Sequence, residues 1–152
     1  LDLARYFSEK DGRKYTLVFI GFGAEEAGLL GSLHFINDPP VDLRKIRFLI
    51  NLDLAGTGDE GITVVNGSIF VNAFRKMREI NAEHVFLPSV KSRGEACNSD
   101  HCPFYRVGVP CFFIYTRGGI QAYHDLDDRY ETLPLTAYQD YYRLLIHFVN
   151  SF

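Results

Sequence analysis

The sequence of 152 residues contains no tryptophan, a single methionine and only three cysteines. No apolar run approaches the roughly 18 residues of a membrane-spanning helix, which argues against a membrane span. The small net charge of −3, from 16 basic and 19 acidic residues, offers no basic face to a nucleic acid. With 47% hydrophobic and 23% charged residues, the chain is expected to fold as one globular domain with a modest core.

The odd number of cysteines leaves at least one thiol without a partner inside the chain. Cys97 and Cys102 are close enough in sequence to form a disulfide, although the sequence alone does not decide this. Without a second cysteine pair, their spacing makes them weak candidates for metal ligands. The simplest interpretation is that Cys97, Cys102 and Cys111 are small buried or surface thiols.

The first residues, Leu1–Phe7, have the pattern of a helix that is already under way. No initiator methionine, capping residue or signal peptide precedes this pattern. We therefore expect the chain to be a piece of a longer protein, in which case any localisation signal lies outside it.

Apolar runs that predict buried strands alternate with stretches at helical spacing. Strands are predicted at residues 14–22, 46–54, 62–65 and 111–115. Helices are predicted at 25–36, from Ser68 as a cap through Ile80, at 101–107 and at the end of the chain. The last helix is expected to bury one stripe, formed by Tyr138, Tyr142, Leu145, Val149 and Phe152. This alternation favours an α/β fold with a mixed, largely parallel sheet flanked by helices.

Three of the predicted strands each lead to a potential metal ligand. Glu25 and Glu26 follow the first, Asp53 lies near the end of the second, and His124 lies in the loop after the last. Because the carboxyl ends of parallel strands meet at one edge of a sheet, these side chains are expected to converge. Carboxylates and imidazole suit zinc, and adjacent glutamates can divide the work of holding a metal and moving a proton.

Each of these residues also has an explanation that involves no function. Acidic residues at the start of a helix are stabilised by the helix dipole, and an aspartate at a strand end is often a turn residue. A nucleotide-binding glycine motif at Gly21 and Gly23 is disfavoured, because Glu26 occupies the third glycine position and would repel a pyrophosphate.

Four segments of the chain together resemble the motifs of the di-zinc aminopeptidase family, which includes glutamate carboxypeptidases and glutaminyl cyclases. In chain order they are Gly23–Ser32 around the two glutamates, Asn51-Leu52-Asp53-Leu54, Ser99–Tyr105 followed by Gly108-Val109-Pro110, and Tyr123–Glu131. Four motifs in family order make the match specific. The resemblance implies a zinc-exopeptidase fold in which residues 1–152 form the C-terminal part of one catalytic domain, incomplete at its N-terminus.

The resemblance also implies a role for each candidate residue. Glu25 would be the general base that takes a proton from the metal-bound water. Glu26 and Asp53 would each ligate one of two zinc ions, and His124 would complete the shell of the second. Tyr123 would help to hold the oxyanion, with plain packing of its loop as the alternative.

The resemblance also separates residues that are not ligands from ligands that lie outside this sequence. Asp100 and His101 are not ligands in the family, and Asp100 is expected to support the ligands or line the pocket. The family has two further ligands upstream, a histidine and an aspartate that bridges both metals, and the segment that carries them is absent here. With three of five expected ligands, this chain alone is expected to bind zinc weakly, to be inactive and to self-associate through uncovered strands.

The leading hypothesis is a zinc-dependent aminopeptidase that removes N-terminal residues from peptides, as part of a longer parent chain. One alternative is a glutaminyl cyclase-like zinc acyltransferase, against which the absence of tryptophan argues because an aromatic pocket is expected there. The other is a metal-free, non-catalytic relative. The resemblance favours a periplasmic or secreted location and leaves the preferred amino acid open.

Overall fold

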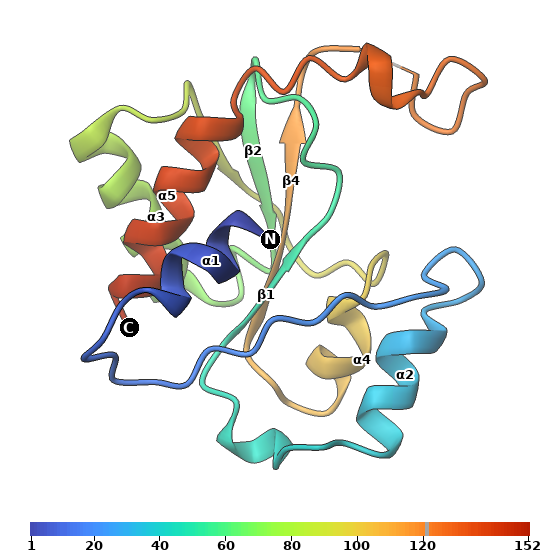
Figure 1. The fold of residues 1–152 in the computed structure, drawn as a ribbon, viewed down its shortest axis with the longest axis vertical. Coiled ribbons are helices and arrows are strands. Elements are labelled where there is room, and N and C mark those ends of the chain that lie inside the picture. Colours follow the sequence, from blue (N-terminus) through green and yellow to red (C-terminus); the bar gives the residue numbers. More distant parts are fainter. Residues whose placement is uncertain (121) are drawn as a thin grey trace.

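The computed structural model describes residues 1–152 except Gln121. The helices and strands are α1 (Asp2–Ser8), α2 (Leu30–Asn37), β1 (Leu49–Leu52), β2 (Gly61–Val65), α3 (Val71–His84), β3 (Val90–Ser92), α4 (His101–Arg106), β4 (Cys111–Arg117) and α5 (Tyr138–Asn150), with short 3₁₀ helices at Leu43–Lys45 and Tyr130–Thr132 (Figure 1). No helix in the described part of the chain is both long and apolar enough to cross a membrane.

The four strands form one sheet in the order β1-β4-β2-β3. β4 pairs in parallel with β1 and in antiparallel with β2, and β2 pairs in parallel with β3. The sheet is therefore mixed but mostly parallel, as predicted. The parallel pair β1–β4 matters most for function, because it brings the chain segments after both strands to the same edge.

The two faces of the sheet are covered by different helices. Phe112 and Ile114 of β4 pack in the main core with the buried residues of α3 and α5. Phe113 lies between them and faces the other side, as alternation along a strand requires, and its ring stacks on that of His101 in α4 at 5.3 Å. α2 packs beside α4, so these two helices and the loops around them form the side of the molecule that carries the candidate residues.

The strand predicted for residues 14–22 is wrong. These residues contain no strand, and Phe19 in their middle is 51% exposed. An apolar, β-rich composition favours an extended backbone, but a strand forms only where a neighbouring edge supplies hydrogen bonds. In the described residues β1 pairs with β4 and with no other strand, so the segment stays unpaired although one edge of β1 is free. The edge strand β3 is not among the strands predicted from the sequence.

The predicted helix at 25–36 begins only at Leu30, because the chain first makes a turn in which Leu29 has a φ of 60°. Ser68 is not a cap, since α3 begins at Val71 after Phe70 and no side chain caps it. The face predicted for α3 is nevertheless buried, as Phe74, Met77 and Ile80 are in the core.

The stripe predicted for the last helix is displaced around the helix axis. The residues of α5 that are buried are Tyr141, Leu144, Leu145, Ile146 and Phe148. Tyr138 and Tyr142 instead stack on each other beside this core, with ring centroids 6.5 Å apart, and Tyr142 also meets Tyr6 of α1 at 6.3 Å. Docking of α1 on this flank explains why aromatic residues occur outside the buried face.

Candidate functional site

A tight loop before α2 carries Glu25 and Glu26. It is closed by backbone hydrogen bonds from Gly31 N to Gly23 O at 3.1 Å and from Leu30 N to Ala24 O at 3.2 Å. A Cβ at Gly31 would lie 2.6 Å from the carbonyl oxygen of Gly23, so only glycine permits this approach. The loop leaves Glu25 half-buried and Glu26 exposed.

Asp53 lies at the carboxyl end of the parallel pair β1–β4. The residue before it, Leu52, pairs with Ile114 of β4, and the backbone N–H of Asp53 donates to the carbonyl of Ile114 at 3.4 Å. His124 lies in the loop that follows β4. The carboxyl ends of β1 and β4 therefore lie side by side, and the convergence of the side chains on one metal stays a prediction.

The Asp53 carboxylate is held by a short hydrogen-bonded chain. Ser99 Oγ donates to Asp53 Oδ2 at 2.9 Å, and Asn51 Nδ2 donates to the same Ser99 oxygen at 2.7 Å. One carboxylate oxygen of Asp53 is thus engaged by a neighbour. A hydrogen bond of this kind fixes the orientation of a potential ligand.

Glu26 and His124 approach each other across the site. The Nε2 atom of His124 lies 4.0 Å from Oε1 of Glu26, and the two side chains are 56% and 79% exposed. The loops that carry them come from opposite ends of the chain, so this proximity is a product of the fold. A carboxylate and an imidazole facing each other in solvent are free to bind a third group.

Glu25 is surrounded by negative charge. Partial burial is the largest cause that raises the pKa of its carboxyl group, and the neighbouring charges of Glu26, Asp53 and Asp100 raise it further. His124 acts in the opposite direction. These effects place Glu25 within electrostatic reach of the other candidate residues and favour its protonated form more than in an isolated glutamate.

Tyr123 is 63% exposed and close to the same acidic residues. Desolvation raises the pKa of its phenol first, followed by the charges of Glu26, Asp53 and Glu25. The phenol therefore keeps its proton and remains a hydrogen-bond donor near the site. Its role in holding an oxyanion stays a prediction.

Left-handed backbone conformations occur beside several candidate residues and also elsewhere, at Leu29, Asn66, Val85 and Leu135. Positive φ angles occur at Ala24 (57°), just before Glu25, at Leu54 (54°), just after Asp53, and at His124 itself (59°). Non-glycine residues seldom adopt this region, and such outliers cluster at functional sites where the surrounding structure enforces them.

The donor set fits zinc chemically but only in part. Glu26, Asp53 and His124 supply the carboxylate and imidazole ligands that zinc accepts, and the crowding of acids around Glu25 is an environment that a cation would relieve. Within the described residues, no group of three or more histidine, cysteine, aspartate or glutamate side chains is arranged to hold a metal ion. Any metal ion held by these residues would therefore need further donors.

Sequence reasoning missed two features of this region. It gave no role to Ser99 or Asn51, although both lie inside quoted motifs, because a contact across 46 residues leaves no periodic signal. It also favoured thiols for all three cysteines, which is wrong for two of them, because the structure joins Cys97 to Cys102 and leaves only Cys111 free and buried among the described residues. Burial raises the pKa of the Cys111 thiol to about 11, which makes it unreactive.

Comparison with known proteins agrees with the motifs. The profile of Peptidase family M28 matches residues 1–149. A probable leucine aminopeptidase of Trichophyton verrucosum (strain HKI 0517) is 30% identical over 144 residues, which cover 90% of this chain and 38% of that protein. The structure of BSAP, a zinc aminopeptidase from Bacillus subtilis, superimposes with a TM-score of 0.71 at 25% identity, covering 86% of this chain and 34% of that one.

Porphyromonas gingivalis glutaminyl cyclase is also similar, with a TM-score of 0.75 at 17% identity over 98% of this chain and 58% of the other. At that identity the likeness is one of fold alone. The chain spans 38% of the leucine aminopeptidase that it matches, so it corresponds to part of such a protein. The profile match over nearly the whole chain, together with the motifs and the site, shows that this chain belongs to peptidase family M28.

Proposed function

We propose that residues 1–152 form the C-terminal part of the catalytic domain of a zinc-dependent aminopeptidase. The observation that carries this proposal is the convergence of Glu25, Glu26, Asp53 and His124 at one edge of the β1–β4 pair. The aminopeptidases among the similar proteins support the reaction class.

Glu25 is the residue best placed to move a proton. It is half-buried, and its raised pKa makes the carboxylate a stronger base. Such a group can accept a proton from an attacking water and return it to a leaving amine. Glu26 is more exposed and faces His124 instead. Different surroundings thus assign different tasks to two neighbouring glutamates.

Glu26, Asp53 and His124 would hold the metal together with donors from outside this chain. When bound, zinc supplies Lewis acidity that polarises the scissile carbonyl and lowers the pKa of water. Ser99 keeps the Asp53 carboxylate oriented, and Tyr123 offers a phenol that can donate a hydrogen bond to the developing oxyanion.

The substrate would be a peptide with a free amino end. The cysteine bridge supports a location in an oxidising compartment, in agreement with the periplasmic or secreted location expected from the resemblance, because such bridges persist there and are rare in the cytosol.

The test uses the full-length protein and three substrates. A leucyl p-nitroanilide with a free amino group should be hydrolysed, its N-acetylated analogue should not, and a chelator should abolish the activity until zinc is restored. Cyclisation of a peptide with N-terminal glutamine, without hydrolysis of the anilide, would instead identify a glutaminyl cyclase. Absence of turnover on all three by the zinc-loaded protein would favour the non-catalytic relative.

A further inference from the structure

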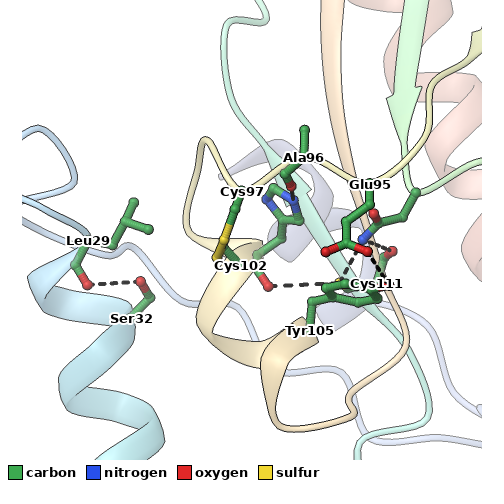
Figure 2. Close-up of a disulfide and its surroundings, with 10 residues drawn as sticks. Leu29, Ser32, Glu95, Ala96, Cys97, Cys102, Tyr105 and Cys111 are labelled. Atoms are coloured by element: carbon green, nitrogen blue, oxygen red, sulfur yellow. Dashed lines mark hydrogen bonds between the residues drawn. A yellow bond between two sulfur atoms is a disulfide. The ribbon is translucent and has the colours of Figure 1, made fainter.

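The loop before α4 is fastened to that helix at several points. The disulfide joins Cys97 in the loop to Cys102 in the first turn of α4, with their Cα atoms 4.9 Å apart (Figure 2). His101 is completely buried, and Nε2 of its ring bonds to the carbonyl of Ala96 at 2.8 Å. Since a carbonyl only accepts, Nε2 donates this bond. Burial lowers the pKa of His101 and favours the neutral ring, and the hydrogen bond to Ala96 acts in the opposite direction.

A further contact fixes the start of the same loop. The hydroxyl of Tyr105, one turn along α4, donates to Oε2 of Glu95 at 3.1 Å (Figure 2). The loop is therefore attached to α4 through residues 95, 96 and 97, and α4 in turn packs on the sheet. Any residue between these attachments is left with little freedom to move.

Ser99 lies between these attachments and is only 1% exposed. Its hydroxyl has one proton, which it gives to Asp53 Oδ2, while it accepts from the amide of Asn51. The amide bond orients the hydroxyl, and the hydroxyl orients the carboxylate. Oδ2 of Asp53 is thereby turned toward the loop, and Oδ1 is left for another partner.

We propose that Ser99 is a positioning residue for Asp53 and that the Cys97–Cys102 bridge keeps Ser99 in the place where it can act. The proposal rests on the proposed function, in which Asp53 is a metal ligand. Residues that orient a ligand typically account for about 10–100-fold in metal affinity. The bridge contributes indirectly, because without it the loop can move away from β1 and take the hydroxyl with it.

The experiment measures the zinc affinity of the full-length protein by competition with a chromophoric chelator. Ser99→Ala should bind zinc about 10–100-fold more weakly than the natural protein. Cys97→Ser combined with Cys102→Ala should weaken zinc binding in the same direction by a smaller factor. Ser151→Ala is the matched control, because it also removes a serine hydroxyl, one that bonds to the carbonyl of Phe148, and it should leave the affinity unchanged.

One further measurement makes the result decisive. The unfolding temperature of each metal-free variant separates positioning from stability, because a merely structural serine would lower that temperature and leave the zinc affinity of the folded protein intact. Such a result would overturn the proposal. An unchanged affinity in the cysteine variant, beside a weakened Ser99→Ala, would overturn the role of the bridge.

Asp53→Asn separates this proposal from the function on which it rests. If Asp53→Asn loses zinc affinity while Ser99→Ala retains it, the positioning role is wrong and the metallopeptidase site stands. If the natural protein binds no zinc at all, the proposed function fails, and the role of Ser99 fails with it.

Discussion

Glu25 and Glu26 are chemically identical neighbours, and only their surroundings distinguish them. Glu25 is half-buried among other acids, whereas Glu26 is exposed and lies 4.0 Å from His124. Burial and neighbouring negative charge favour a carboxyl group that exchanges protons, while exposure beside an imidazole favours a carboxylate that binds a metal together with that imidazole. The division of labour between these two residues is therefore a property of the loop that presents them.

We predict that Glu25→Gln in the full-length protein lowers kcat for the leucyl anilide by about 10²–10⁴-fold, because the amide keeps the shape of the side chain but cannot accept the proton. Steady-state kinetics measures the loss. Glu9→Gln, which changes an exposed glutamate after α1, should have no effect. An unchanged kcat in Glu25→Gln would show that Glu25 is not the general base.

The candidate residues could be chosen from the sequence because each lies in a short motif whose residue types match a known chemistry, and their roles stay predictions. Their support was not predictable. The bond from Ser99 to Asp53 joins residues 46 apart, and it depends on how α4 packs against β1, which no local pattern encodes. The positive φ angles at Leu54 and His124 likewise appear only once the fold is known.

Elements with their own periodicity and their own partners were predicted well. β2, β4, α3 and α4 occur within a few residues of their expected positions, because each buries a continuous apolar run or stripe. The strand predicted at residues 14–22 is absent because that segment pairs with no strand, and the predicted start of α2 is wrong because turn geometry at Leu29 overrides helical spacing. Strand pairing and turn geometry depend on the rest of the chain, so they cannot be predicted from the periodicity of one segment.

The loop that carries the glutamates depends on Gly31 at its base. We predict that Gly31→Ala destabilises the protein by about 1–3 kcal/mol, because the new Cβ would meet the backbone of Gly23. The kcat of the folded variant should also fall, since a small displacement of a catalytic group can lower the rate by about 10²-fold. Urea unfolding and steady-state kinetics measure the two effects.

Gly21→Ala provides the control for this prediction. Nothing lies within 4 Å of a Cβ at that position, which belongs to the same segment. A Gly31→Ala protein that matched Gly21→Ala in both stability and rate would show that the loop does not need this close approach.

At the scale of the whole molecule, one side of the sheet is left incomplete. β1 is an edge strand, and Leu54 after it and Phe19 in the segment at 14–22 are exposed large apolar residues. Exposed apolar residues near an unpaired edge favour pairing with another chain.

We therefore predict that residues 1–152 in isolation self-associate. Light scattering over a range of concentrations should detect species larger than a monomer, and Phe19→Lys should reduce them by placing a charge on the apolar segment. Val107→Lys, at an exposed position after α4, is the control and should not reduce them. A monomer at every concentration that unfolds cooperatively would contradict this prediction.

The central claim is that Glu26, Asp53 and His124 jointly hold zinc while Glu25 does not. The most direct test is the zinc content of the purified full-length protein and its variants, measured by mass spectrometry of the metal. The natural protein and Glu25→Gln should carry the same amount of zinc, whereas Glu26→Gln, Asp53→Asn and His124→Gln should each carry less. Full zinc in those three variants, or loss of zinc in Glu25→Gln, would contradict the account.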